Sequence, residues 1–195
     1  MGAPAARKEL SDEPAEEEKL GLLRIAREAI AARLEGKKYE PVPIPSLDER
    51  KQGVFVTLWI YGKLRGCMGR IQARESVPDA VAMMAPVAAF EDPRFPELTP
   101  EELPDLMIEL SLLSRLERVR DFDNDIVVGR DGLLVKLDLH SGLLLPRIPV
   151  EYGWGTREFL EQTCLKAGLP KNAYKDKYAE VYKFTAFKFC EQAEK

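Results

Sequence analysis

The residues of this sequence best suited to chemistry lie in one hexapeptide, Leu64-Arg65-Gly66-Cys67-Met68-Gly69. In an extended segment, Arg65 and Cys67 lie on the same face. A guanidinium near a thiol favours the thiolate, which is the reactive form of cysteine. The pattern therefore indicates a catalytic nucleophile, a redox thiol or an anion contact. The alternative is a bulged strand with a buried structural cysteine, because glycines inside strands usually mark bulges or close approaches to the backbone.

A second unusual segment is Asp92-Pro93-Arg94, where two opposite charges flank a proline in a predicted loop. Loops often carry function, but Asp-Pro also simply starts turns. Local rules tend to be broken at functional or strained sites, and both segments break them. We therefore expect four side chains to line one concave surface: Arg65, Cys67, Asp92 and Arg94. Gly66 and Gly69 are candidate substrate-binding positions, because neither carries a side chain that would cover the site.

Three further groups have an ordinary and a functional interpretation. His140 is the only histidine and is predicted at a turn, where a solvated side chain is a commoner role than general base. Glu109 projects opposite the apolar face of its strand, so it either pairs with Arg65 or acts as an acid or base. We favour the ion pair, because buried charges need partners. The lysines and tyrosines of residues 166–190 could hold single-stranded nucleic acid, but a solvated strand and loop is the favoured interpretation.

Composition excludes several classes of protein. The 195 residues, with 45% hydrophobic and 32% charged, are enough for one globular domain. A net charge of −4 argues against general binding to nucleic acid or to anionic membranes. The longest apolar stretch, residues 81–90, contains Pro86 and is far shorter than the ~20 residues that span a bilayer. One histidine and three scattered cysteines predict no metal site, no disulfide framework and no cofactor, and they favour a cytoplasmic protein.

The hydrophobic periodicity predicts an α+β fold with a mostly antiparallel sheet flanked by helices. Residues 1–11 are predicted to be a disordered tail. Helices are expected over residues 12–36, after Ser76, after Thr99 and over 157–167, with Pro86 kinking or ending the second. Strands are expected over residues 53–61, 64–72, 106–113, 126–128, 133–137, 143–145 and 179–189. Turns are placed at Gly62–Lys63, at Asp131-Gly132 as part of a β-hairpin, and at His140-Ser141-Gly142.

The hexapeptide closely resembles the Leu-Arg-Gly-Cys-Ile-Gly signature of the AMMECR family, with Met68 in place of isoleucine. Further similarities follow in family order over residues 16–190: Ala89-Phe90-Glu91-Asp92-Pro93-Arg94-Phe95, Glu109-Leu110-Ser111-Leu112-Leu113, Gly142-Leu143-Leu144-Leu145-Pro146 and Cys164-Leu165-Lys166-Ala167-Gly168-Leu169. The resemblance implies one AMMECR-type domain over residues 12–195, with a larger and a smaller lobe and a cleft between them. Arg147 departs from the family pattern, where many relatives have glutamine.

The resemblance implies no established activity. In archaea and bacteria the family is known as protein A of the AmmeMemoRadiSam system, which implies a shared modification pathway with a Memo-like protein and a radical-SAM enzyme. Our first hypothesis is a small cytoplasmic enzyme or enzyme subunit, with Cys67 as nucleophile or substrate-positioning thiol in an Arg/Cys-lined cleft. The second is a non-enzymatic binding or scaffold protein that uses the same cleft, and RNA binding is a third, weaker hypothesis.

Overall fold

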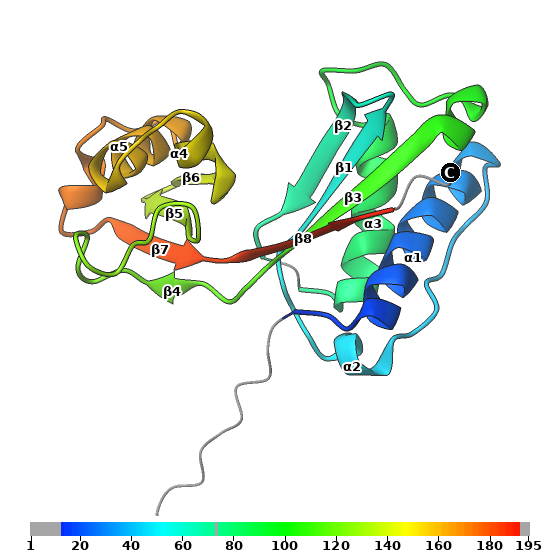
Figure 1. The fold of residues 1–195 in the computed structure, drawn as a ribbon, viewed down its shortest axis with the longest axis horizontal. Helices are drawn as coiled ribbons and strands as arrows, with labels where there is room; N and C mark the ends of the chain where they lie inside the picture. Colours follow the sequence, from blue (N-terminus) through cyan, green and yellow to red (C-terminus); the bar gives the residue numbers. More distant parts are fainter. Residues whose placement is uncertain (1–12, 73, 192–195) are drawn as a thin grey trace, which may run out of the picture.

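The computed structural model describes residues 13–72 and 74–191, which form two four-stranded antiparallel sheets with helices (Figure 1). The helices are α1 (Glu16–Leu34), α2 (Pro45–Asp48), α3 (Val77–Phe90), α4 (Arg147–Glu151), α5 (Thr156–Lys166) and the 3-10 turns η1 (Pro100–Asp105) and η2 (Ala173–Lys175). The strands are β1 (Val54–Ile60), β2 (Lys63–Arg70), β3 (Leu106–Leu113), β4 (Glu117–Arg118), β5 (Gly132–Leu137), β6 (His140–Leu144), β7 (Glu180–Phe184) and β8 (Ala186–Cys190). The predicted tail, residues 1–11, lies outside the described residues.

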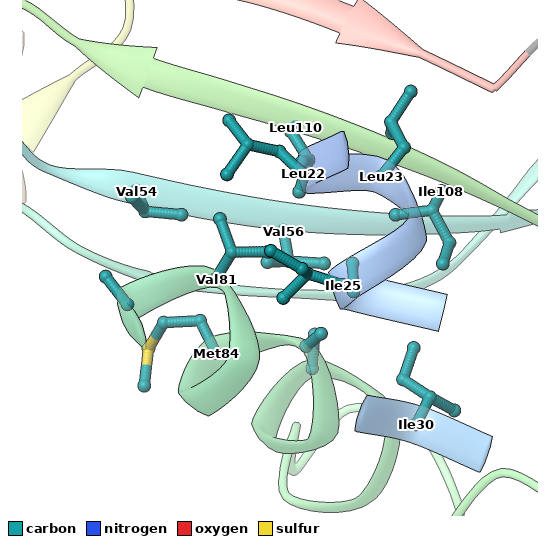
Figure 2. Packing of buried hydrophobic residues seen from close by; sticks show 14 of the residues in the cluster. Leu22, Leu23, Ile25, Ile30, Val54, Val56, Val81, Met84, Ile108 and Leu110 are labelled. Carbon is teal, nitrogen blue, oxygen red and sulfur yellow. The ribbon is translucent and has the colours of Figure 1, made fainter. Parts of the chain in front are cut away.

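The first sheet has the strand order β2-β1-β3-β8 and packs one face against α1 and α3. Alternate residues of β1 and β3 point into this core, where Val54, Val56, Ile108 and Leu110 are fully buried against the two helices (Figure 2). Burial of one such side chain contributes about 1.5–3 kcal/mol, so this layer is a main source of stability. The remaining residues of β1, which include Phe55 and Thr57, lie on the face without helices.

The second sheet has the strand order β4-β7-β5-β6 and packs one face against α5. Leu133, Val135 and Val181 of this face are buried against Phe159 and Leu160 of the helix. The periodicity over residues 157–167 predicted this helix correctly. Both sheets therefore have one face covered by helices and one face without them.

The two helix-free faces meet in a small apolar cluster. Its buried members Leu134 and Phe184 belong to the second sheet, and Leu113 lies at the end of β3. Phe55 and Tyr182, one from the helix-free face of each sheet, pack against them. Residues of both sheets thus meet in this apolar cluster.

The α+β prediction with antiparallel pairing is confirmed, because every strand pair is antiparallel. The single strand predicted over residues 179–189 is wrong, since the chain changes sheets at Thr185 between β7 and β8. The chain also passes from the first sheet to the second at Ser114, between β3 and β4. The Ser114 hydroxyl accepts a hydrogen bond of 2.9 Å from the Thr185 N–H. An unbroken alternating pattern hides this division because both halves are half-buried strands.

Several turns were also misplaced. Residues 126–128 form no strand; Asp131 instead accepts a hydrogen bond of 2.8 Å from the Val127 N–H and closes a loop. His140 begins β6, and the turn lies just before it at Asp138, which has a positive φ of 53°. The β1–β2 turn uses Tyr61 and Gly62, both with positive φ, one position earlier than predicted. These shifts follow from loop chemistry that short apolar runs do not reveal.

Helix α3 begins after its Ser76 cap, as predicted, but does not end at Pro86. It continues to Phe90 and so delivers the following loop, with Asp92 and Arg94, to the edge of the first sheet. Among the described residues, no helix is both long enough and apolar enough to cross a lipid bilayer.

Candidate functional site

The hexapeptide forms most of β2, the edge strand of the first sheet. The register changes within it: Gly66 pairs with Leu58, whereas Leu64 pairs with Trp59, so Arg65 is an extra residue. The bulge that the two glycines predicted is therefore present. The bulge interrupts the alternation of side chains between the two faces of β2. Arg65 therefore does not lie in line with Cys67 on one face of the strand.

The Asp92-Pro93-Arg94 loop binds the backbone of Cys67. The Cys67 N–H donates a hydrogen bond of 2.9 Å to Asp92 Oδ2, and Arg94 Nη2 donates one of 3.2 Å to the Cys67 carbonyl oxygen. Asp92 and Arg94 form an ion pair of 2.6 Å, in which the Asp92 side chain is only 2% exposed. Arg94 and the Cys67 N–H hold the pKa of Asp92 far below its usual range, although burial opposes this. We call Asp92 and Arg94 the β2 clamp.

The clamp explains where the Cys67 thiol lies. Because the N–H and C=O of Cys67 point away from β1, Cys67 and Thr57 form a non-hydrogen-bonded antiparallel pair, whose side chains come closest. Cys67 Sγ is 3.3 Å from Thr57 Oγ1, and Cys67 is half-buried. Arg94 also interacts with Cys67 electrostatically, since the pKa of its guanidinium is raised first by Asp92 and to a smaller degree by Cys67.

Arg65 binds a different part of the same loop. Its guanidinium donates to both carboxylate oxygens of Glu102, at 2.7 and 3.0 Å, and to the carbonyl oxygens of Pro96 and Glu97. The predicted ion pair with Glu109 is wrong, because Glu109 instead pairs with Lys188 at 2.8 Å. The bulge is the physical reason, since it directs Arg65 toward the loop and η1.

The two glycines are required by groups of the protein itself. A Cβ at Gly66 would lie 2.1 Å from the Ala88 carbonyl oxygen of α3, and one at Gly69 would lie 2.5 Å from the Phe55 ring. Gly66 thus permits close packing of helix and sheet, and Gly69 permits Phe55 to lie across β2. A substrate contact at either glycine stays a prediction.

A similar clamp lies on the other side of the sheet, where β8 ends and leaves the first residues of β3 without a neighbouring strand. Glu191 accepts a hydrogen bond of 2.9 Å from the Ile108 N–H of β3, and Arg27 donates to the Leu106 carbonyl oxygen. Arg27 and Glu191 form an ion pair of 2.6 Å. Sequence reasoning missed this clamp, since 164 positions separate its members and no local motif marks them. Each clamp thus binds strand backbone that has no neighbouring strand on that side, and such cover discourages pairing with other chains.

The other candidates lie apart from Cys67. His140 is exposed in the second sheet. Tyr174 is buried under α5, whereas Tyr178 is 70% exposed, so these two tyrosines do not share one exposed stacking surface. Cys164 is buried, and burial raises the pKa of its thiol. Within residues 13–72 and 74–191, no group of three or more histidine, cysteine, aspartate or glutamate side chains could hold a metal.

A groove of about 1000 Å³ lies at a different place, between α1 and the ends of β3 and β8. Its lining includes Arg27 and Glu191 of the second clamp, together with Met107 and Phe189. The groove is part of the opposite edge of the sheet from Cys67. The hypothesis of one concave surface lined by all four predicted side chains therefore stays a prediction; the structure brings Cys67, Asp92 and Arg94 into direct contact and holds Arg65 on the same loop.

These features define an α+β protein with two antiparallel sheets, in which two separate segments fix one half-buried thiol at a sheet edge. The AMMECR1 family profile matches residues 23–189. A protein of Methanothermobacter thermautotrophicus is 42% identical over 177 residues, which cover 87% of this chain and 92% of the relative. Protein PH0010 of Pyrococcus horikoshii is 44% identical over 184 residues, 88% of each chain. The chain belongs to the AMMECR1 family.

The fold is also that of a solved relative. The crystal structure of the uncharacterized protein PH0010 matches with a TM-score of 0.77 at 43% identity, over 88% of this chain and 90% of that one. The resemblance seen in the hexapeptide is thus confirmed at the level of family and fold.

Proposed function

We propose that this protein is a cytoplasmic enzyme, or a subunit of one, that holds its substrate beside the Cys67 thiol. The observation that carries the proposal is the convergence of two segments on one residue: the β2 clamp binds both backbone groups of Cys67, and Thr57 contacts its sulfur. Groups held so tightly are pre-organised, which is what binding and catalysis require. Arg94, half-exposed beside the thiol, supplies positive charge for an anionic group of the substrate.

The two sheets would form the larger and the smaller lobe, and the substrate would enter a cleft between their helix-free faces. Cys67 and Thr57 lie on one of these faces, and Tyr182 lies on the other. Membership of the AMMECR1 family supports a role beside a Memo-like protein and a radical-SAM enzyme in one modification pathway. The alternative is a non-enzymatic binding protein that uses the same surface. It is favoured by the fact that Arg65, Asp92 and Arg94 already have partners within the chain.

The test is iodoacetamide labelling of the native protein against pH, followed residue by residue by mass spectrometry. Only the thiolate reacts, so the labelling midpoint reports the thiol's ionisation. We expect Cys67 to label in the folded protein, and we expect Arg94→Gln to move its midpoint to higher pH. Arg65→Gln is the matched control and should leave the midpoint unchanged. Buried Cys164 is the internal control, which should label only on unfolding.

If Cys67 also labels only on unfolding, the thiol is structural and the enzyme hypothesis is wrong. The binding-protein hypothesis would then take its place. A complementary search is native mass spectrometry of the protein after incubation with a cell metabolite extract, with Cys67→Ser as control. A small molecule retained by the wild type and lost from the variant would support the proposal.

A further inference from the structure

The helix-free face of the second sheet holds Tyr182 between two cations. Arg118 of β4 lies directly opposite Tyr182 of β7, and its Cζ atom is 5.7 Å from the centre of the tyrosine ring. Lys136 of β5 approaches the same ring, with Nζ 5.6 Å from the centre. Both distances fall within the ~6 Å range of cation–π contacts. Two positive charges therefore converge on one aromatic side chain.

These charges are not balanced locally. Arg118 forms an ion pair of 2.7 Å with Glu180, which is also the cross-strand neighbour of Lys136. In the part of the chain that the structure describes, Lys136 has no carboxylate partner within ion-pair distance. Two cations and one anion leave this face with a net positive charge, although the whole chain carries −4. A lysine ammonium has three hydrogen-bond donors. The face of the tyrosine ring attracts the charge of Lys136 but offers its donors no conventional hydrogen-bond acceptor.

The position of Tyr182 connects this surface to the Cys67 face. Tyr182 packs in the same apolar cluster as Phe55 of β1. Phe55 in turn lies two residues from Thr57, the neighbour of Cys67, on the helix-free face of the first sheet. The positive surface and the thiol thus lie on two faces that diverge from one apolar contact.

We propose that Arg118, Lys136 and Tyr182 form a binding site for the carboxylate or phosphate group of a small molecule. The tyrosine holds the two cations apart and in place, and an anion replaces water at the ammonium of Lys136. The site would bind the charged end of the substrate whose other end reaches Cys67. In this last respect alone the inference rests on the proposed function; anion binding itself does not depend on the thiol.

The test is a chemical-shift titration of the backbone amides, with inorganic pyrophosphate and citrate as separate probes. We expect saturable chemical-shift changes at Arg118, Lys136 and Tyr182. The probe with the lower dissociation constant shows whether the site prefers a phosphate or a carboxylate. Lys136→Gln should raise the dissociation constant about threefold to fivefold, as expected for one half-exposed charge pair. Lys136→Arg should restore binding, because it restores the charge.

The matched control is Lys171→Gln, which removes the same charge from an exposed loop position and should leave the dissociation constant unchanged. Equal weakening in both lysine variants, or shifts that never saturate, would overturn the inference in favour of general counter-ion attraction. Binding of single-stranded oligouridylate that tightens with length, without saturable binding of either small anion, would overturn it in favour of nucleic acid. Cys67→Ser should bind the anions normally. If neither anion binds but Cys67 is reactive toward iodoacetamide, this site is refuted and the proposed function is not. If the anions bind but Cys67 is inert, only the proposed function is refuted.

Discussion

Removal of the Asp92 charge should strongly destabilise the protein. Asp92→Asn keeps the shape of the side chain but leaves Arg94 without its carboxylate partner and places an amide where two oxygens accept four hydrogen bonds. Breaking a buried ion pair by removing one partner costs about 3–5 kcal/mol. Arg94 is 54% exposed and can be hydrated, so we expect the lower end, about 3 kcal/mol, in urea unfolding at pH 7.

The same pair predicts the direction of the pH dependence. The pKa of Asp92 is lowered on folding, so the stabilisation is fully present above the unfolded value of about 3.9 and is lost as pH falls toward the folded value. The difference in unfolding free energy between wild type and Asp92→Asn should therefore stay constant down to about pH 4 and shrink as the pH falls from there toward about pH 2. The measurement is urea unfolding followed by circular dichroism across this range.

Asp131→Asn is the matched control for this experiment. Asp131 is equally buried, pairs with Arg130 at 2.7 Å and accepts a backbone N–H, but it lies in the loop before β5 of the second sheet. It should cost a similar free energy without changing the labelling rate of Cys67, whereas Asp92→Asn should increase that rate. A loss below about 0.5 kcal/mol for Asp92→Asn, the usual range for surface changes, would refute the clamp as a source of stability.

Three further changes test the frame around the thiol. Gly66→Ala should cost about 2 kcal/mol or more in urea unfolding, because its Cβ would meet the Ala88 carbonyl oxygen; an unchanged midpoint would contradict this. Arg27→Gln should lower the free energy of unfolding by about 2–4 kcal/mol through the opposite clamp, and Cys67 labelling at low urea should stay at the wild-type rate. Arg65→Gln should speed amide hydrogen exchange in residues 96–98; exchange as slow as in wild type would show that Arg65 does not hold the loop.

The fold was largely predictable because its strands alternate and its helices have strong boundary signals. Ser76 and Thr99 begin α3 and η1 as capping rules predict, and β1 and β3 follow their apolar period. The second sheet was less predictable. Its short strands depend on tertiary contacts such as the crossing at Thr185, which local periodicity does not encode.

Some contacts of the candidate site could be predicted from the sequence and others could not, and the physical reason differs from residue to residue. Cys67 and Asp92 could be brought together because each stands in a segment that breaks a local rule, and such violations require compensation nearby. The partner of Arg65 could not be predicted, because one bulged residue redirects a side chain without any change in residue types. Glu109 was accordingly assigned the wrong cation.

Comparison of the two clamps shows which part of the site is specific. Each clamp binds backbone that has no neighbouring strand, using an arginine and a carboxylate, so this kind of cover alone requires no cysteine. The β2 clamp differs because the residue that it binds carries a thiol, half-buried and in contact with Thr57. A function peculiar to this edge must therefore act through Cys67, or through release of the clamp that positions it. Labelling of Cys67 in Asp92→Asn separates these two cases. If the clamp only restricts access, its loss exposes the thiol and speeds labelling, even where the thiol has no chemistry of its own.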